Sequence, residues 1–296
     1  MSEMNWEARL IIHQTTPLPG ETRENERDFL KRLEESSGAD LVAFPELALT
    51  GYSLKNQVQR HAVSLGDAGP LALPPETPPV AYGLPERGRD ELVYNTAILQ
   101  HRNRILGKHR KVYLPTYGLF DEGRYFARGQ TTPPVVEIPS GWRVGLLVCE
   151  DFWHPGLLYL VAMQGADLIL VLSAAPGRGE PAREAESRSA GTLFSSPETW
   201  TLLARTAAIQ YGVYLALANR AGVEEGLTFA GGSMVVGPSG QVLAEAPQGQ
   251  GATLDLRLSR AELRRARTPF AHLRDEDPAY LARSLDKLLG GGGCGR

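Results

Sequence analysis

Residues 145–153 read Gly-Leu-Leu-Val-Cys-Glu-Asp-Phe-Trp, an apolar run that ends at a lone cysteine followed by two carboxylates. The residues from Trp142 to Val148 are typical of a buried strand, and Pro155-Gly156 interrupts any continuation. We therefore expect Cys149 at a turn between a strand and a helix, where open α/β sheets expose reactive groups. Such a turn presents the thiol and the following backbone N–H groups to one pocket. The alternative is a buried structural cysteine, the commoner fate of a free thiol.

Composition indicates one or two globular domains, with 42% hydrophobic and 22% charged residues among 296. A net charge of -3 gives no electrostatic reason to expect nucleic acid or a membrane surface as partner. The two cysteines, Cys149 and Cys294, imply no disulfide framework and favour a reducing cytoplasm. The N-terminal residues lack a basic region followed by an apolar run, and no stretch approaches about 18 consecutive apolar residues. We expect a cytoplasmic protein that is neither secreted nor membrane-spanning.

The N-terminal part alternates between strand and helix. A strand is predicted over 9–14, a helix over 21–37 and a short buried strand over 39–44 that ends at Pro45-Glu46. The four residues Gly38-Ala39-Asp40-Leu41 recur as Gly165-Ala166-Asp167-Leu168, each time between a predicted helix and a predicted strand. This recurrence indicates two related halves of one fold.

Further elements follow in the same alternation. Residues 66–90, rich in proline and glycine, are interpreted as a surface excursion, and 174–196 as a loop long enough to act as a lid. The expected domain covers 1–258, and 259–296 form a helical arm with a disordered glycine-rich tail. Strands are predicted over 93–99, 168–172, 213–218, 232–236 and 242–246, the last two joined as a hairpin, and helices over 157–164 and 198–211.

Several kinds of chemistry lack their motifs. The six histidines show no His-Glu-x-x-His or other paired spacing, and no Cys-x-x-Cys is present, so we expect no metal site and no cofactor. A P-loop and the Gly-x-Ser-x-Gly turn of serine hydrolases are also absent.

What remains is a thiol with acids and a lysine to activate it. A thiol that attacks an amide needs a base for its proton, a donor for the oxyanion and an acid for the leaving nitrogen. Glu46 can serve as base and then as acid. Lys111, among apolar neighbours, can supply positive charge to the oxyanion. Glu46, Lys111 and Cys149 each stand at or near the end of a predicted strand.

Three motifs then point to a family: Phe44-Pro45-Glu46-Leu47, Arg110-Lys111-Val112-Tyr113-Leu114-Pro115 and Val148-Cys149-Glu150-Asp151. In this order, they make the chain resemble the nitrilase, or carbon-nitrogen hydrolase, superfamily, whose triad is Glu, Lys and Cys. The resemblance covers nearly everything from residue 9 to 258 and implies a four-layer α-β-β-α sandwich of the α/β class. It also implies that Glu122 is a further glutamate that positions the lysine and substrate.

Within the superfamily the chain is most similar to the glutaminase domain of glutamine-dependent NAD synthetase. By that resemblance Tyr52, Tyr117, Glu150 and Ser173 contact the substrate, with Glu150 meeting the α-amino group of glutamine. For the two tyrosines, core packing with a satisfied hydroxyl is the alternative. The segments that carry this likeness are Glu46 to Tyr52, Leu92 to Thr96, Tyr117 to Glu122 and Cys149 to Trp153.

Two departures from the family pattern concern the amino-acid end of the substrate. Ala175 stands where the family has a serine in Asn-x-Ser-x-Ser-Pro, and Ala230 stands where it has the aspartate of Phe-Asp-Gly-Gly-Ser. The segment after Leu258 is also too short for the synthetase's ATP-binding domain.

These observations predict an enzyme that hydrolyses a small carboxamide through a Cys149 thioester. The expected substrate is glutamine, hydrolysed to glutamate and ammonia for a separate NAD synthetase subunit, and the chain is expected to form a homo-oligomer. One alternative is a free-standing amidase, such as an ω-amidase or a carbamoyl-amide hydrolase. The other is a catalytically silent binding subunit, against which the intact Glu46, Lys111 and Cys149 argue.

Overall fold

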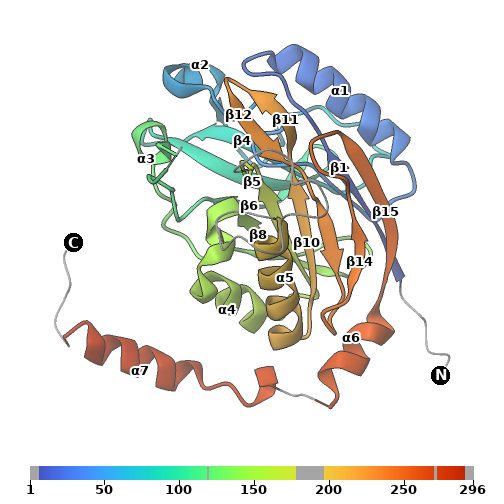
Figure 1. The fold of residues 1–296 in the computed structure, drawn as a ribbon, viewed down its shortest axis with the longest axis vertical. Coiled ribbons are helices and arrows are strands. Elements are labelled where there is room, and N and C mark those ends of the chain that lie inside the picture. Colours follow the sequence, from blue (N-terminus) through green and yellow to red (C-terminus); the bar gives the residue numbers. More distant parts are fainter. Residues whose placement is uncertain (1–6, 119, 178–196, 270–271, 291–296) are drawn as a thin grey trace, which may run out of the picture.

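Two β-sheets lie face to face, and helices cover their outer faces (Figure 1). The structure is a computed structural model that describes residues 7–118, 120–177, 197–269 and 272–290. The first sheet has the strand order β15-β1-β2-β4-β5-β6, with β3 paired to β4, and the second has the order β14-β13-β10-β9-β8-β7. The four-layer α-β-β-α sandwich implied by the resemblance is therefore confirmed.

The strands of the first sheet are β1 (Glu7–Gln14), β2 (Leu41–Ala43), β3 (Val63–Ser64), β4 (Val80–Arg87), β5 (Val93–His101), β6 (Arg104–Arg110) and β15 (Ala252–Ser259). Those of the second are β7 (Val135–Glu137), β8 (Arg143–Val148), β9 (Leu168–Ser173), β10 (Tyr214–Asn219), β13 (Met234–Val236) and β14 (Val242–Glu245), and a separate hairpin pairs β11 (Ala221–Glu224) with β12 (Leu227–Ala230). The α-helices are α1 (Thr22–Glu35), α2 (Val58–His61), α3 (Glu122–Tyr125), α4 (Pro155–Met163), α5 (Pro197–Tyr211), α6 (Arg260–Arg267) and α7 (Pro278–Leu288).

Apolar packing joins the four layers. On the outer face of the first sheet, α1 buries Phe29 against Phe44, with ring centroids 4.1 Å apart. On the second sheet, α4 approaches β8 so closely that a Cβ on Gly145 would lie 2.1 Å from a methyl carbon of Val161. A glycine is therefore required beneath α4. One continuous cluster that includes Leu10 of β1 and Val144 of β8 fills the space between the sheets.

The two four-residue repeats occupy equivalent places in the two sheets. The backbone N–H of Asp40 donates to the carbonyl of Arg9 (2.9 Å), and its carboxylate accepts from the N–H of Arg9 (2.8 Å). Asp167 makes the same pair of hydrogen bonds to Arg143, at 2.8 and 3.2 Å. Each aspartate thereby joins the start of one strand to its parallel neighbour, β2 to β1 and β9 to β8. The interpretation of two related halves is confirmed at this level.

The prediction of a surface excursion over 66–90 is wrong for its second part. Residues Val80–Arg87 form β4 near the middle of the first sheet, and all but the last residue are buried. The sequence pattern is misleading because Gly83 and Pro85 within the strand are read as loop signals. A Cβ at Gly83 would lie 2.4 Å from the backbone nitrogen of Leu47, so this glycine gives room to the segment that carries Glu46.

Strand β15 and the β11–β12 hairpin are not among the predicted elements. β15 pairs antiparallel with β1 over eight residues, from Glu7 opposite Ser259 to Gln14 opposite Ala252. Its alternation of Leu254, Leu256 and Leu258 with polar residues is a strand signal that was available in the sequence. The other predicted helices and strands are confirmed to within a few residues at each end. They are the elements predicted over 9–14, 21–37, 39–44, 93–99, 157–164, 168–172, 198–211, 213–218, 232–236 and 242–246.

The chain after β15 forms two helices that differ in how they pack. Ser259 caps α6, whose Leu263 is buried in the large core cluster. By contrast, α7 projects from the rest of the molecule, and no residue in it is buried (Figure 1). We propose that 1–258 form one domain and 259–296 an arm anchored through Leu263. The tail predicted after Gly290 and residues 178–196 of the predicted lid lie outside the described residues.

Within the part of the chain that the structure describes, no helix is long and apolar enough to cross a membrane.

Candidate active site

The strand-to-helix turn predicted at Cys149 is present. Cys149 directly follows β8, begins a 3₁₀ helix (Cys149–Trp153) and has a φ of 44°, a left-handed conformation that few non-glycine residues adopt. The side chain is 4% exposed, and the hydroxyl of Ser173, at the end of β9, donates to its Sγ at 3.4 Å. The thiol therefore lies at the carboxyl ends of two parallel strands.

Asp151 holds the turn to the segment that follows β6. Its buried carboxylate accepts hydrogen bonds from the backbone N–H groups of Val112 (3.0 Å) and Tyr113 (2.9 Å), and from the ring of His109 (2.8 Å). It also accepts from the N–H of Val148 (3.3 Å). Because Lys111 lies between His109 and Val112, Asp151 fixes the distance between the lysine segment and the cysteine turn.

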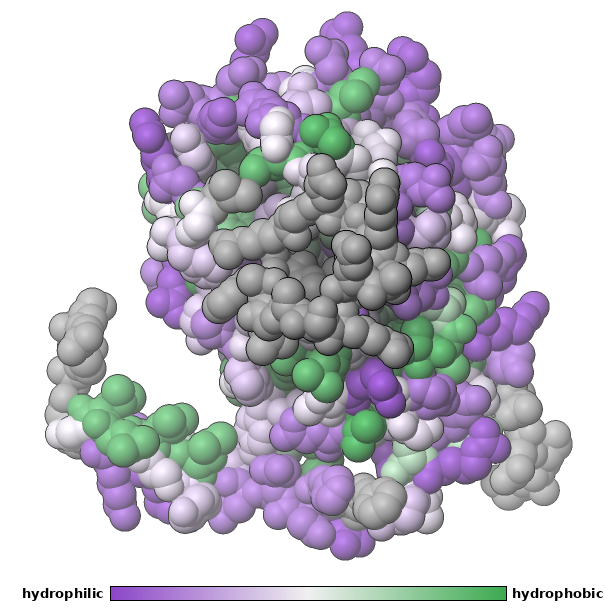
Figure 2. Space-filling view, in the orientation of Figure 1, coloured by the Kyte–Doolittle hydropathy of each residue, from purple (hydrophilic) through white to green (hydrophobic). Residues whose placement is uncertain are grey.

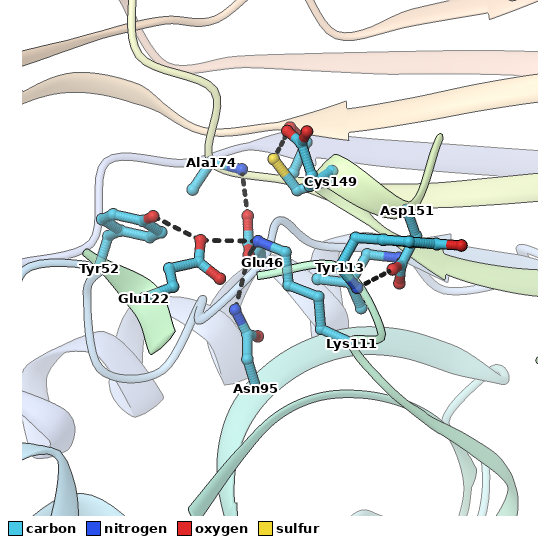
Figure 3. A network of polar contacts seen from close by, with 12 residues as sticks. Glu46, Tyr52, Asn95, Lys111, Tyr113, Glu122, Cys149, Asp151 and Ala174 are labelled. Atoms are coloured by element: carbon cyan, nitrogen blue, oxygen red, sulfur yellow. Dashed lines mark hydrogen bonds and ion pairs between the residues drawn. The ribbon is translucent and has the colours of Figure 1, made fainter. Parts of the chain in front are cut away.

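Glu46 follows β2 and is completely buried. Its Oε1 accepts from Asn95 Nδ2 (2.7 Å) and Lys111 Nζ (2.9 Å), while Oε2 accepts from the backbone N–H of Ala174 (2.7 Å). The carboxylate is held by donors from three separate segments, so its position is fixed before any substrate binds (Figure 3).

Lys111 is completely buried between two glutamates (Figure 3). Its Nζ lies 2.9 Å from Glu46 Oε1 and 2.7 Å from Glu122 Oε1. Its backbone N–H donates to the carbonyl of Asn95 (2.8 Å), which continues the β5–β6 pairing to the end of the strand. The structure thus brings Glu46, Lys111, Glu122 and Cys149 together from segments that are far apart in the sequence.

The electrostatics of this cluster keep the lysine charged and the thiol protonated. Burial alone would lower the pKa of Lys111, but the carboxylates of Glu122 and Glu46 outweigh it and raise that pKa well above its usual value. Burial and the nearby Glu46 carboxylate raise the pKa of Cys149. Burial also raises the pKa of Glu122 to about 7, although Lys111 opposes this shift.

The residues predicted to contact substrate fall into two groups. The partly buried Tyr52 donates its hydroxyl to Glu122 Oε1 at 2.5 Å, and Ser173 is buried beside Cys149, so both contact the cluster of Glu46, Lys111, Glu122 and Cys149. Tyr117, which is 54% exposed, donates to both carboxylate oxygens of Glu150 at 3.0 and 2.9 Å. Burial raises the pKa of Glu150. This outer pair is accessible, whereas the hydroxyl of Tyr52 is already committed.

Several residues that organise the site have no role in the predictions made from the sequence. Asn95 and Asp151 lie inside the quoted motifs, but their side chains were not identified as partners of Glu46 and of the Lys111 segment. The signal for both is a polar residue in or next to a buried apolar strand. Among the described residues, no group of three or more His, Cys, Asp or Glu side chains is placed to hold a metal ion.

Two facing sheets with a buried cysteine, lysine and glutamate at their strand ends define a nitrilase-fold hydrolase. The family model described as carbon-nitrogen hydrolase matches residues 27–268. The chain therefore belongs to the carbon-nitrogen hydrolase family, and it is an enzyme of that family.

Similar proteins fall into two kinds. The glutamine-dependent NAD(+) synthetase of Aquifex aeolicus is 30% identical over 265 residues, which cover 87% of this chain and 43% of that protein. The enzyme of the same name from Thermotoga maritima is 33% identical over 253 residues, which cover 79% and 39%. The chain thus spans about two fifths of the length of these relatives.

The second kind is similar over its whole length. The amidase from Nesterenkonia sp. AN1, solved as a double mutant in complex with acrylamide, superposes with a TM-score of 0.74 at 26% identity. The match covers 96% of this chain and 99% of the amidase.

Proposed function

We propose that this chain hydrolyses a small carboxamide through a thioester on Cys149. The observation that carries the proposal is the buried contact of Lys111 Nζ with both Glu46 and Glu122, next to a cysteine at the end of a strand. A core without a catalytic role gains little from one buried ammonium and two carboxylates, because the desolvation of each charge costs several kcal/mol.

In the proposed reaction, Glu46 takes the thiol proton while Sγ of Cys149 attacks the amide carbon. The carbonyl oxygen becomes an oxyanion that Lys111 and the backbone N–H after Cys149 stabilise. Glu46 then returns the proton to the nitrogen, the C–N bond breaks, and ammonia leaves a thioester behind. Water, deprotonated by Glu46, attacks the thioester and releases the carboxylic acid with the thiol restored.

The raised pKa of Cys149 favours a base-assisted attack. A stored thiolate would be costly in this buried, carboxylate-rich site, so the proton has to move as the S–C bond forms. Glu122 supports the same step from the other side of Lys111. Its Oε2 is buried and has no hydrogen-bond partner among the described residues, so it is available to the N–H of a bound amide.

The first candidate substrate is glutamine, with ammonia passed to a separate NAD synthetase subunit. Similarity to two NAD synthetases supports it. So does the exposed Tyr117–Glu150 pair, whose carboxylate suits an ammonium group at the far end of the substrate.

A free-standing amidase is the second candidate. The two departures from the family pattern, Ala175 and Ala230, lie side by side, since the N–H of Ala230 donates to the carbonyl of Ala175 at 3.3 Å. At these two adjacent positions methyl groups replace the polar side chains of the family pattern, which favours a less polar amide as substrate. End-to-end similarity to an amidase points the same way.

A panel of amides distinguishes the two candidates. Ammonia release is measured from glutamine, a dicarboxylic monoamide, a carbamoyl amide and a short aliphatic amide, with and without a separately encoded NAD synthetase. If glutamine is the substrate, we expect the highest kcat/KM for glutamine and glutamine-dependent NAD formation in the mixture. Rapid hydrolysis of another amide by this chain alone, with no effect of the synthetase, would replace the glutaminase proposal by the amidase.

We further propose that the chain self-associates through α7. Its exposed apolar residues gather on one side of a helix that projects from the rest of the molecule (Figure 2). A second copy is the proposed occupant because the same chain also exposes Leu202 and Ile209 on α5, and a two-fold axis would bury both faces at once. Light scattering of the purified protein measures its oligomeric state. The apolar residues of α7 are Tyr280, Leu281, Leu285 and Leu288.

The proposed roles predict an acid limb in the pH profile. As the pH falls through about 7, Glu122 takes up a proton and loses its charge toward Lys111, so kcat/KM should fall below that pH. In Glu122→Gln the limb near pH 7 should disappear at a lower overall rate. Glu150→Gln is the matched control, because it removes another glutamate whose pKa is raised and should leave the acid limb in place. A limb that follows Glu150 would refute the assignment to Glu122.

A further inference from the structure

A second buried ion pair lies outside the proposed catalytic cluster. Arg220 directly precedes β11 and Glu224 is the last residue of that strand; they are 1% and 2% exposed and contact each other directly. The guanidinium of Arg220 also lies 4.1 Å from the ring centroid of Phe229 on β12. No step of the proposed reaction uses either charge. A buried pair of this kind is a poor source of stability, because desolvation offsets much of the attraction.

Glu224 holds the two peptide N–H groups on either side of the Cα of Tyr52, near the site. Its Oε2 accepts from the backbone N–H of Tyr52 (3.2 Å), and its Oε1 accepts from that of Ser53 (2.5 Å). The ring of Tyr52 also packs edge-on against Phe229, with centroids 5.6 Å apart. The hairpin therefore fixes both the backbone and the ring of Tyr52.

Tyr52 connects this pair to the catalytic lysine. Its hydroxyl donates to Glu122 Oε1 at 2.5 Å, and the same oxygen accepts from Lys111 Nζ at 2.7 Å. Figure 3 shows this sequence of contacts from the tyrosine through the glutamate to the lysine. A shift of the Tyr52 backbone would lengthen the first hydrogen bond and leave Lys111 as the donor to that oxygen.

The base of the hairpin also reaches the cysteine side of the site. The backbone N–H of Arg220 donates to the carbonyl of Ser173 (3.1 Å), and the hydroxyl of Ser173 contacts Cys149. A cation just before β11 and an anion at the end of that strand are thus tied to both sides of the proposed reaction centre.

We propose that the Arg220–Glu224 pair is a positioning device that aims the Tyr52 hydroxyl at Glu122 and so keeps Glu122 and Lys111 in their reactive arrangement. This inference rests on the proposed function, since it concerns the same lysine. The hydrogen bond from Tyr52 favours the ionised form of Glu122, so its loss should raise the pH at which Glu122 takes up a proton.

The test uses the full chain and three variants. Arg220→Met together with Glu224→Gln removes both charges, which avoids a lone buried charge; the glutamine keeps one carbonyl oxygen, so at least one of the Tyr52 and Ser53 N–H groups loses its acceptor. Tyr52→Phe removes only the hydroxyl. The third variant combines all three substitutions. Tyr82→Phe is the matched control, because it removes another buried tyrosine hydroxyl, bonded to Gln100 Oε1 at 2.6 Å.

We expect Tyr52→Phe and the Arg220→Met/Glu224→Gln variant each to lower kcat at pH 7 about fivefold or more, the effect of one hydrogen bond, with little change in KM. Both should move the acid limb of the pH profile upward, and the combined variant should be no worse than the poorer of the two. Tyr82→Phe should lower the melting temperature only. If the losses multiply, or if the limb stays in place while stability falls, the positioning role is refuted.

A second readout separates this inference from the proposed function. Alkylation of the Cys149 peptide by iodoacetamide, followed by mass spectrometry across pH, reports on the site without a substrate. If no amide is hydrolysed but Tyr52→Phe and the Arg220→Met/Glu224→Gln variant shift the alkylation profile alike, the proposed function fails and the positioning role stands. If amides are hydrolysed and neither profile shifts, the positioning role fails alone.

Discussion

Replacing Cys149 by alanine is expected to reduce amide hydrolysis by at least about 10⁴-fold, because no nucleophile remains to form the thioester. The fold should persist. The side chain is small, its one hydrogen bond to another described residue is the 3.4 Å contact from Ser173, and alanine can adopt the same left-handed backbone at a similar cost. Ammonia release and the melting temperature check the two halves of this prediction.

Mass spectrometry of the wild-type protein adds a direct observation. Rapid quenching during turnover should give a peptide that carries the acyl group of the substrate on Cys149, and the alanine variant should give none. Ser173→Ala is the control, since it removes the hydrogen bond to Sγ but keeps the thiol, so it should still form the adduct. An adduct on a different residue, or near wild-type turnover by Cys149→Ala, would exclude the mechanism.

The main features of the site could be predicted from the sequence because each chemical residue follows a recognisable strand. Glu46 and Cys149 follow short apolar runs that form β2 in the first sheet and β8 in the second. Each of these strands pairs with a parallel neighbour in its own sheet, so each residue lies beyond the carboxyl end of a parallel strand. The four-residue recurrence around Asp40 and Asp167 similarly indicates that the two halves are related. In the structure the two aspartates make equivalent hydrogen bonds.

The residues that hold the site together could not be predicted in the same way. Gly83 reads as a loop residue because the segment that it accommodates is distant in sequence, and the contact between Glu224 and Tyr52 spans 172 residues. Such contacts depend on how the two sheets and the hairpin pack, which no local pattern encodes. Single-sequence patterns therefore predict which residues meet in the buried cluster, while the contacts that position them depend on the folded structure.

Replacing Lys111 by methionine is expected to affect both activity and stability. Methionine has a similar length but no charge, so the oxyanion loses its cation, and kcat/KM should fall by at least about 10²-fold. Glu46 and Glu122 would then face each other's charge in a site from which water is excluded. Removing one partner of a buried ion pair costs about 3–5 kcal/mol, so the free energy of unfolding at neutral pH should fall by that amount.

A second substitution separates these two effects. Glu122→Gln in the Lys111→Met background removes one of the two uncompensated carboxylates, so a large part of the lost unfolding free energy should return, as measured by urea denaturation. Activity should not return, because neither glutamine nor methionine supplies a positive charge to the oxyanion. Glu150→Gln in the same background is the control: its carboxylate makes no contact with Lys111 and pairs with Tyr117, so it should restore little stability. Recovery of hydrolysis in the Lys111→Met/Glu122→Gln variant would mean that Lys111 serves only to neutralise Glu122, and the oxyanion role would have to pass to the backbone N–H groups alone.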